Sequence, residues 1–197
     1  MQFDSTPLSQ KHTRLLPMEA THASALYDAG RHPEIWNHLP ARMNCFEDMT
    51  RLVENALQQK ARGDEFPFVV EEIRTGRIVG STRYCDIQPA HRNLEVGWTW
   101  LTPDVWRTPI NTECKYLLLQ NAFETLGVVR VCLKTDARNI RSQRAIERLG
   151  AVKEGVLRQH RILPDGFVRD SVYYSILDRE WPVVKEGLER RMAGISG

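Results

Sequence analysis

The 197-residue sequence has no long apolar run and no block of five or more like charges. A membrane-spanning helix needs about 18 or more apolar residues, and nucleic-acid binders usually cluster Lys and Arg. With 27 Lys and Arg against 25 Asp and Glu, the formal net charge is only +2. We therefore expect no membrane span and no nucleic-acid partner. The N-terminus also lacks the basic-then-apolar pattern of a secretion signal, which predicts a cytoplasmic protein.

Cysteine is scarce and widely spaced. Cys45, Cys85, Cys114 and Cys132 are never closer than 18 positions, which excludes a C-x-x-C redox pair and a compact zinc cluster. We expect no metal, and we expect buried, reduced thiols at Cys85 and Cys132, which lie in apolar strand patterns. The chain also lacks the Lys-Ser/Thr of a P-loop and a glycine-rich dinucleotide fingerprint, so the sequence gives only weak support to a nucleotide-binding function.

The remaining composition is that of an ordinary folded domain. Hydrophobic residues make up 42% and charged residues 26% of the chain, and a chain of this size buries enough surface to fold without a metal or a disulfide. We expect a single domain over residues 12–197, preceded by an N-terminal arm over residues 1–11. Arginines between Arg130 and Arg169 either favour an anionic ligand or form a solvated surface.

Hydrophobic periodicity predicts alternating strands and helices. Helices are expected at 21–29, 46–62, 109–126, 139–149 and 181–192, and strands at 13–16, 66–72, 78–87, 93–101, 129–135, 152–162 and 167–177. Several strands are joined as hairpins, whereas 93–101 and 129–135 are joined through a helix and should be parallel neighbours. The order predicts an α/β domain with a mixed, mostly antiparallel sheet of about seven strands and helices on both faces.

Two of these strands have distinct patterns. In 93–101, Leu94, Val96, Trp98 and Trp100 alternate with Glu95, Gly97 and Thr99, which predicts a regular strand with one apolar face. The strand 129–135 is almost continuously apolar, as expected when both faces are covered.

The turn between Leu101 and the helix at 109–126 is a candidate anion site. Thr108 suits a helix N-cap and Pro109 the first helical position, which leaves the N–H groups of Ile110 and Asn111 without a helical partner. The Thr108 hydroxyl and the Arg107 guanidinium would add contacts to a phosphate. The alternative is a well-capped helix without a ligand.

Several short motifs, in this order, resemble the GCN5-related N-acetyltransferases (GNAT), in particular the RimJ/RimL-like branch. They are Leu-Glu-Val-Gly-Trp at 94–98, Ile-Asn-Thr-Glu at 110–113, Asn139-x-x-Ser142, and Leu-Gly-Ala-Val-x-Glu-Gly-Val-Leu-Arg at 149–158. The resemblance covers residues 11–180. It implies a GNAT-like domain with a splay between the strands at 94–101 and 129–135, and acetyl-CoA as cofactor with CoA as product.

The family's phosphate loop usually reads Gln/Arg-x-x-Gly-x-Gly/Ala. The matching positions here are Trp106, Pro109 and Asn111, and all three depart from the pattern. Pro109 removes one amide donor, and a hydrogen bond to a charged group contributes roughly 1.5–3 kcal/mol. We therefore expect the cofactor to be held more weakly or differently, with Arg107 and Thr108 offsetting part of the loss.

The resemblance also assigns roles along the expected cofactor path. Main-chain groups of Trp98 and Leu101 would contact the pantetheine arm, and Asn139 would hydrogen-bond it. An amide side chain has donors and acceptors, which suits an amide of the ligand. The alternative for Asn139 is a helix N-cap, and both roles are compatible.

Acetyl transfer to an amine needs a proton acceptor and a proton donor but no enzyme nucleophile. Glu95 is the candidate base, with a structural salt bridge as its alternative. Ser142 is the candidate acid that protonates the leaving sulfur, or else an ordinary first-turn serine. Tyr173 and Asp170 are candidate substrate residues, although Tyr173 is also a candidate for packing against Tyr84 or Phe167. His91 and His160 are expected at the surface.

The sequence therefore predicts an N-acetyltransferase that moves an acetyl group from acetyl-CoA to a primary amine. The amine is either a protein N-terminus or a small molecule, and the sequence does not identify it. The alternative is a non-catalytic acyl-CoA-binding or sensing module, motivated by Pro109 and Asn111. A homodimer is one of the assemblies that the sequence permits.

Overall fold

A computed structural model of the chain describes residues 1–194. Its eight strands form one sheet in the order β1-β2-β3-β4-β5-β6-β8-β7. Neighbouring strands are antiparallel except β5 and β6, which are parallel. The mixed, mostly antiparallel α/β sheet is the predicted one, with one strand more than expected. The strands are β1 (Leu8–Ser9), β2 (Thr13–Pro17), β3 (Phe66–Glu72), β4 (Arg77–Gln88), β5 (Asn93–Leu101), β6 (Arg130–Asp136), β7 (Val152–Ile162) and β8 (Val168–Leu177).

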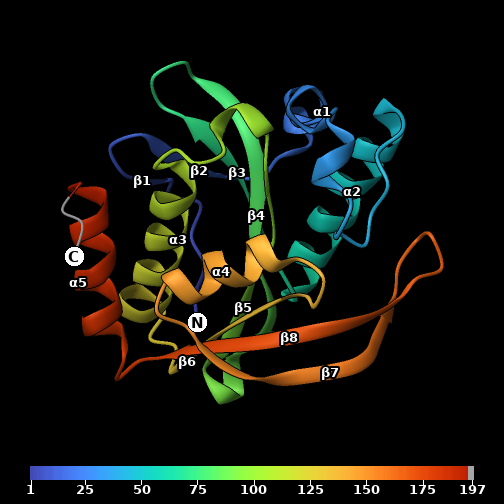
Figure 1. Cartoon of the computed structure of the whole chain (residues 1–197). Helices are drawn as coiled ribbons and strands as arrows, with labels where there is room; N and C mark the ends of the chain where they lie inside the picture. Colours follow the sequence, from blue (N-terminus) through green and yellow to red (C-terminus); the bar gives the residue numbers. More distant parts are fainter. Residues whose placement is uncertain (195–197) are drawn as a thin grey trace.

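Helices cover both faces of this sheet, as the sequence predicts. One apolar cluster joins the sheet to α3, α4 and α5, and a second joins it to α1 and α2. In Figure 1, α3 and α5 lie to the left of the central strands and α1 and α2 to the right. The helices are α1 (Ala23–Gly30), α2 (Phe46–Arg62), α3 (Ile110–Gln120), α4 (Ile140–Arg148) and α5 (Trp181–Met192), and α3 continues as a π-helical turn over Asn121–Thr125.

Helix α2 shows how local sequence sets these boundaries. The Asp48 carboxylate accepts the backbone N–H of Cys45 at 3.3 Å, which closes a capping box at the N-terminus. Met49, Val53 and Ala56 are buried at helical spacing against the sheet. Gly63 then adopts a left-handed conformation with φ 81°, which ends the helix.

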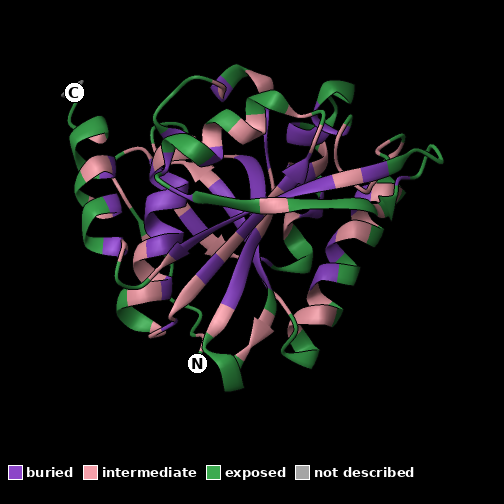
Figure 2. Ribbon diagram, turned by 60° about the horizontal axis from the view of Figure 1, so that its bottom comes forward, coloured by how far each residue is buried: buried purple, intermediate pink, exposed green. Residues whose placement is uncertain are grey.

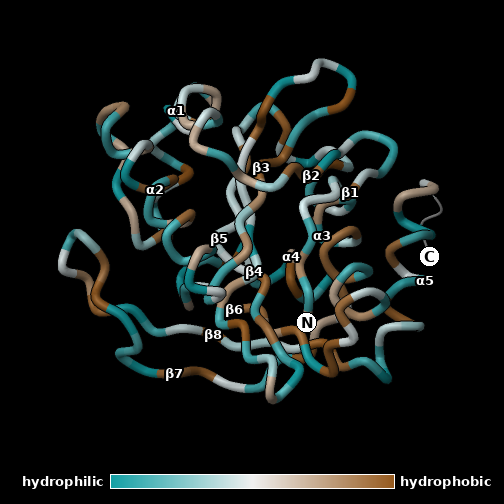
Figure 3. The backbone as a smooth tube through the Cα atoms, turned by 180° about the vertical axis from the view of Figure 1, so that it is seen from behind, coloured by the Kyte–Doolittle hydropathy of each residue, from teal (hydrophilic) through white to brown (hydrophobic). Residues whose placement is uncertain are grey.

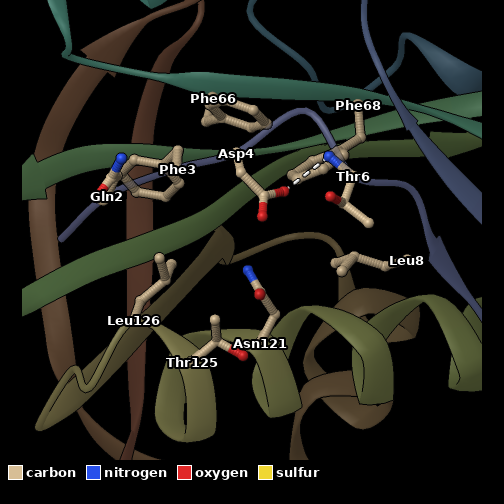
Figure 4. A pocket seen from close by; sticks show the side chains of 10 residues that line it. All are labelled: Gln2, Phe3, Asp4, Thr6, Leu8, Phe66, Phe68, Asn121, Thr125 and Leu126. Atoms are coloured by element: carbon tan, nitrogen blue, oxygen red, sulfur yellow. Dashed lines mark hydrogen bonds between the residues drawn. The ribbon is translucent and has the colours of Figure 1, made fainter.

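The N-terminal residues 1–11 pack against the sheet. Phe3 stacks on Phe66 with ring centroids 5.1 Å apart, and Leu8 pairs with Leu15 to add β1 to the sheet edge. Figure 4 shows this segment lying over Phe66 and Phe68, opposite Asn121. The space between them is only about 30 Å³, which holds little more than a water molecule.

Strand β5 is not the regular strand that its sequence predicts. Gly97 pairs with Arg83 and Trp100 with Ser81, so three steps along β5 match two along β4. Trp98 carries this bulge, with φ 51°. The bulge turns Trp100 to the α1/α2 side of the sheet, where it lies 5.3 Å from Trp36. Leu94 and Val96 face α3 instead, so the predicted common face of these apolar residues is wrong beyond residue 96.

Strand β6 is also less apolar than predicted. Val131 and Leu133 are buried in the α3 cluster, whereas Cys132 and Lys134 alternate with them and face the α1/α2 side. Lys134 pairs directly with Tyr173 on β8. The outer strand β7 is mostly exposed and appears in green in Figure 2, while its inner neighbours are largely buried. The sheet therefore presents polar side chains on one face where β5, β6 and β8 meet.

Strands β5 and β6 pair over only three positions. The register runs from Asn93 with Arg130 to Glu95 with Cys132 and then stops, although both strands continue. Beyond that point, the facing edges of β5 and β6 have separated. This is the expected splay, and it lies at the carboxyl ends of two parallel strands, where α/β sheets commonly bind ligands.

Candidate active site

The turn before α3 has a defined backbone. Arg107 is exposed and adopts a left-handed conformation with φ 64°, which is uncommon for a residue other than glycine. Pro109, not Thr108, is the helix N-cap, and the first α-helical hydrogen bond runs from Glu113 N–H to the Pro109 carbonyl at 2.9 Å. The Thr108 hydroxyl instead donates to the Val105 carbonyl at 2.7 Å, so the predicted cap was one residue early.

The shifted cap changes which amides face outward at this turn. The N–H groups of Ile110, Asn111 and Thr112 precede the first intrahelical bond, and only that of Ile110 meets the Thr108 hydroxyl, at 3.4 Å. Pro109 lies outside the helix, so its missing N–H removes a donor that the helix would not have used. The α3 N-terminus therefore retains anion-binding character despite the proline.

Trp106 connects this turn to the end of β5 and to α4. Its indole Nε1 donates to the Leu101 carbonyl at 2.8 Å. The Arg141 guanidinium lies over its ring, 3.9 Å from the centroid. The Thr102 N–H donates to the Val79 carbonyl on β4. Because the backbone groups of successive strand residues point to opposite sides, the N–H and C=O of Leu101 point away from β4, toward the β5/β6 gap. The predicted Leu101 contact is available through its N–H, while its carbonyl already accepts one hydrogen bond from the indole.

Asn139 and Ser142 lie where β6 leads into α4. The Asn139 side-chain oxygen accepts the Ser142 N–H at 3.0 Å, so Asn139 is the N-cap of α4. Its amide NH₂ remains a donor for a ligand, and the two proposed roles are compatible. Ser142 is half-buried in the first turn of α4. Among residues 1–194, no hydrogen bond or ion pair joins Ser142 to Glu95.

Glu95 is buried and paired with a lysine, not with an arginine. It is 4% exposed, and its Oε2 lies 2.6 Å from Lys134 Nζ. Burial disfavours charge on Lys134, but the Glu95 carboxylate outweighs it and raises the Lys134 pKa above its ordinary value. Gly97 leaves space here, because a Cβ on this residue would lie 2.7 Å from Glu95 Oε1. The salt-bridge alternative for Glu95 therefore has a definite partner.

Tyr173 continues this group of polar side chains toward β7. Lys134 Nζ lies 5.8 Å from the centre of the Tyr173 ring, and the Tyr173 hydroxyl lies 3.4 Å from His160 Nε2. His160 Nδ1 is 3.0 Å from the hydroxyl of Ser171, which also accepts Arg169 Nε at 3.1 Å. Burial, together with Arg161, Lys134 and Arg169, lowers the His160 pKa. His160 is therefore half-buried in the polar group and is not the surface residue that the sequence predicts.

Asp170 has a structural contact that the sequence did not indicate. Its Oδ1 accepts the N–H of Gln159 at 2.7 Å, at a bulge in β7 where Gln159 has φ 50°. Tyr173 packs against His160 with ring centroids 5.7 Å apart, and the predicted alternatives of Tyr84 and Phe167 have other partners. Lys134 and His160 were missed because strand alternation reveals them only once the facing strands are known.

A cavity of about 480 Å³ lies on the same α1/α2 face of the sheet, lined by other residues than this polar group. Trp98, the bulge residue of β5, lines it together with Arg83 from β4 and Pro164 from the β7–β8 turn. Seen from behind in Figure 3, α2 and the β7–β8 turn lie on the same side of the molecule. The cavity is thus bounded by segments that lie up to 124 positions apart (40 to 164) in the sequence. Its remaining lining residues are Pro40, Ala41, Arg42, Asp48, Arg51, Leu52, Asn55, Gln59 and Glu65.

Comparison with known proteins assigns this arrangement to a family. The family model for the Acetyltransferase (GNAT) domain matches residues 12–152, which is most of the chain. The chain belongs to the GNAT acetyltransferase family. The match contains the splayed strands, the α3 turn, and the Asn139 cap of α4.

Individual relatives agree with this family membership. The chain is 30% identical over 137 residues to the uncharacterized N-acetyltransferase YoaA of Bacillus subtilis, covering 68% of this chain and 75% of YoaA. A solved structure from T. thermophilus, assigned to the acetyltransferases, is 38% identical with a TM-score of 0.88 and covers 98% of this chain and 100% of its own. A GCN5-related N-acetyltransferase from Brucella melitensis is 27% identical with the same TM-score, over 94% of this chain and 85% of its own.

The ribosomal L7/L12 α-N-protein acetyltransferase RimL has the same fold, with a TM-score of 0.78 over 87% of this chain and 94% of its own. At 17% identity, this likeness extends to the fold alone. Within residues 1–194, every helix is too short or too polar to cross a bilayer.

Proposed function

We propose that the protein is an acetyl-CoA-dependent N-acetyltransferase acting on a primary amine. The observation that carries this proposal is the coincidence of three features at one end of the sheet. They are the gap between β5 and β6, the N-terminus of α3 beside it, and the polar group around Glu95 and Tyr173 on the α1/α2 face. Membership of the GNAT family supports the same reaction.

The residues at the gap suit acetyl-CoA. The pyrophosphate would be held by the amides of Asn111 and Thr112, with the Arg107 guanidinium as the nearest exposed cation in this turn. The main-chain N–H of Leu101 and the Asn139 amide would hold the pantetheine arm. When bound, the cofactor supplies an acetyl group activated as a thioester. Trp98 would contribute main-chain groups at the bulge, as the family resemblance predicts.

Side chains of this protein would accept the proton from the amine and donate a proton to the leaving sulfur. Two polar pairs, Glu95 with Lys134 and Tyr173 with His160, lie next to each other on the α1/α2 face of the sheet, with Lys134 Nζ 5.8 Å from the centre of the Tyr173 ring. We propose that Glu95 accepts the proton of the incoming ammonium, directly or through water, while Lys134 holds the carboxylate in position. Ser142, at the start of α4, remains our candidate donor to the leaving sulfur. Tyr173 and Asp170 line the acceptor side in this proposal.

The RimJ/RimL branch, a protein N-terminus as acceptor and a cytoplasmic location remain predictions from the sequence. A non-catalytic acyl-CoA-binding module remains the second candidate, because Pro109 and Asn111 depart from the usual phosphate loop. The shifted cap at Pro109 favours binding, and in a binding module the ion pair of Glu95 with Lys134 would be purely structural.

A binding test with a matched control examines the cofactor site. Millimolar CoA should raise the melting temperature of the wild-type protein by mass action. Asn111→Asp places a negative charge where the pyrophosphate would lie and should weaken CoA binding about tenfold or more. Asn44→Asp makes the same change just before α2 and should leave CoA binding unaltered.

A turnover test then separates the enzyme from the binding module. Only an acetyltransferase releases free thiol from acetyl-CoA when amines are supplied. Stabilisation by CoA without thiol release across a broad amine panel would favour the sensing module. A melting temperature that CoA leaves unmoved would contradict both functions.

A further inference from the structure

The acceptor cavity, the cavity of about 480 Å³ in which we place the acceptor amine, contains charges of both signs, and most of them are already paired. Its lining includes three arginines and two carboxylates: Arg42, Arg51, Arg83, Asp48 and Glu65. Their formal sum is +1. The charged groups come from α2, from the segment before it, from the residue that precedes β3, and from β4.

Two of the lining residues, Arg83 and Glu65, form a buried ion pair. The Arg83 side chain is 5% exposed, and its Nη1 lies 2.7 Å from Glu65 Oε2. Its guanidinium also lies over the Trp98 ring, 4.7 Å from the centroid. Arg83 Nε is buried without a hydrogen-bond partner among residues 1–194. The Glu65 carboxylate is therefore committed to Arg83 and is poorly placed to bind a second cation.

The carboxylate of Asp48 is committed as well. It accepts the N–H groups of Asn44 at 2.8 Å and Cys45 at 3.3 Å, and it pairs with Arg51. The hydrogen bond from the Asn44 amide is the main cause that lowers the Asp48 pKa, so the carboxylate stays ionised as part of the α2 cap. Both acidic groups of the cavity thus serve the protein itself.

Arg42 is different from the other charges of the cavity. It is exposed, and no carboxylate of residues 1–194 lies within 4 Å of its guanidinium. An unpaired guanidinium at the edge of a cavity offers a planar set of donors that matches a carboxylate or a phosphate. A polyamine or a lysine-rich peptide would instead meet an excess of positive charge and two carboxylates that are already occupied.

We infer that the acceptor is an amine that also carries an anionic group, a carboxylate or a phosphate, and that Arg42 recognises that group. This inference rests on the proposed acetyltransferase function and adds the chemical class of its acceptor. The cavity volume of about 480 Å³ accommodates a small amine of this class. Trp98 lines the same cavity at the bulge of β5, which joins the acceptor side to the cofactor side.

Pairs of amines that differ in the anion test the inference. Thiol release from acetyl-CoA would be measured with L-phenylalanine against 2-phenylethylamine, and with phosphoethanolamine against ethanolamine. The wild-type protein should favour the anionic member of at least one pair about tenfold or more in kcat/KM. The pair that shows the preference distinguishes a carboxylate from a phosphate.

Variants connect the preference to Arg42. Arg42→Gln should reduce the preference to about twofold or less, mainly by raising KM for the anionic amine. The kcat/KM for the amine that lacks the anionic group should stay unchanged. Arg62→Gln, an exposed change at the end of α2 outside the cavity, should retain the wild-type preference.

Equal kcat/KM values within each pair, or a preference that survives in Arg42→Gln, would overturn the inference and leave the acetyltransferase function standing. Absence of thiol release with every amine would instead refute the function on which it rests.

Discussion

Replacing Glu95 by Gln removes one partner of a buried ion pair and leaves Lys134 without its counter-charge. Glu95 is 4% exposed and 2.6 Å from the lysine, whose side chain is 18% exposed. Breaking a buried pair by removing one partner typically costs about 3–5 kcal/mol. Because Lys134 is partly accessible, we expect about 3 kcal/mol, which corresponds to a fall in melting temperature of roughly 10 °C in a protein of this size.

The same change tests the chemistry. If Glu95 accepts the substrate proton, Glu95→Gln should lower kcat by about 100-fold or more with little change in acetyl-CoA affinity.

The double variant Glu95→Gln/Lys134→Met separates the two roles. It removes both charges and should recover most of the lost free energy of unfolding, measured in urea, while kcat stays low. A kcat for Glu95→Gln equal to that of the wild type would remove Glu95 from the base role. A Glu95→Gln variant as stable as the wild type would show that the ion pair is not a significant buried interaction.

Three further changes have defined outcomes. Trp106→Phe loses the bond to the Leu101 carbonyl and should weaken CoA binding about fivefold, by a loss of about 1 kcal/mol, as seen by titration calorimetry; unchanged affinity would mean that the indole does not organise the turn. Asp136 is 1% exposed, and although burial opposes it, hydrogen bonds from Arg138 lower its pKa, so its contribution to stability is present above about pH 4 and lost as the pH falls through the folded pKa. Asp136→Asn should therefore destabilise the protein in urea more at pH 7 than at pH 3, and a difference that is independent of pH would contradict this reasoning. Gly80→Ala would place a Cβ 2.1 Å from the Trp100 carbonyl and should cost about 3 kcal/mol or more, whereas Gly155→Ala meets nothing within 4 Å and should be almost neutral in thermal unfolding.

Much of the fold could be predicted because local patterns determine it. The spacing of Met49, Val53 and Ala56 with the stop at Gly63 predicted α2 from Phe46 to Arg62, as the structure has it. The bulge at Trp98 was missed because the residues of β5 alternate perfectly in sequence, and the extra residue is visible only against the pairing with β4. The N-cap at Pro109 was placed one residue early because the Thr108 hydroxyl has a competing acceptor, the carbonyl of Val105.

The candidate site divides in the same way. Glu95 and Asn139 could be chosen from the sequence, because a carboxylate in an apolar strand and an amide before a helix are visible locally. Their partners could not be chosen. Lys134 is 39 positions from Glu95 in the sequence. The contact of His160 with Tyr173 depends on the register of β7 with β8 and on the bulge in β7.

The sequence by itself determined the order of elements, the position of each helix along the chain and the family resemblance, because periodicity and caps are properties of neighbouring residues. Only the tertiary structure decided which charges are paired. In the folded protein Glu95 pairs with Lys134, Glu65 with Arg83 and Asp48 with Arg51. Arg42 lines the acceptor cavity and forms no ion pair with a carboxylate of residues 1–194. Ion pairing depends on distances across strands and between layers, and those distances arise only when the chain is folded.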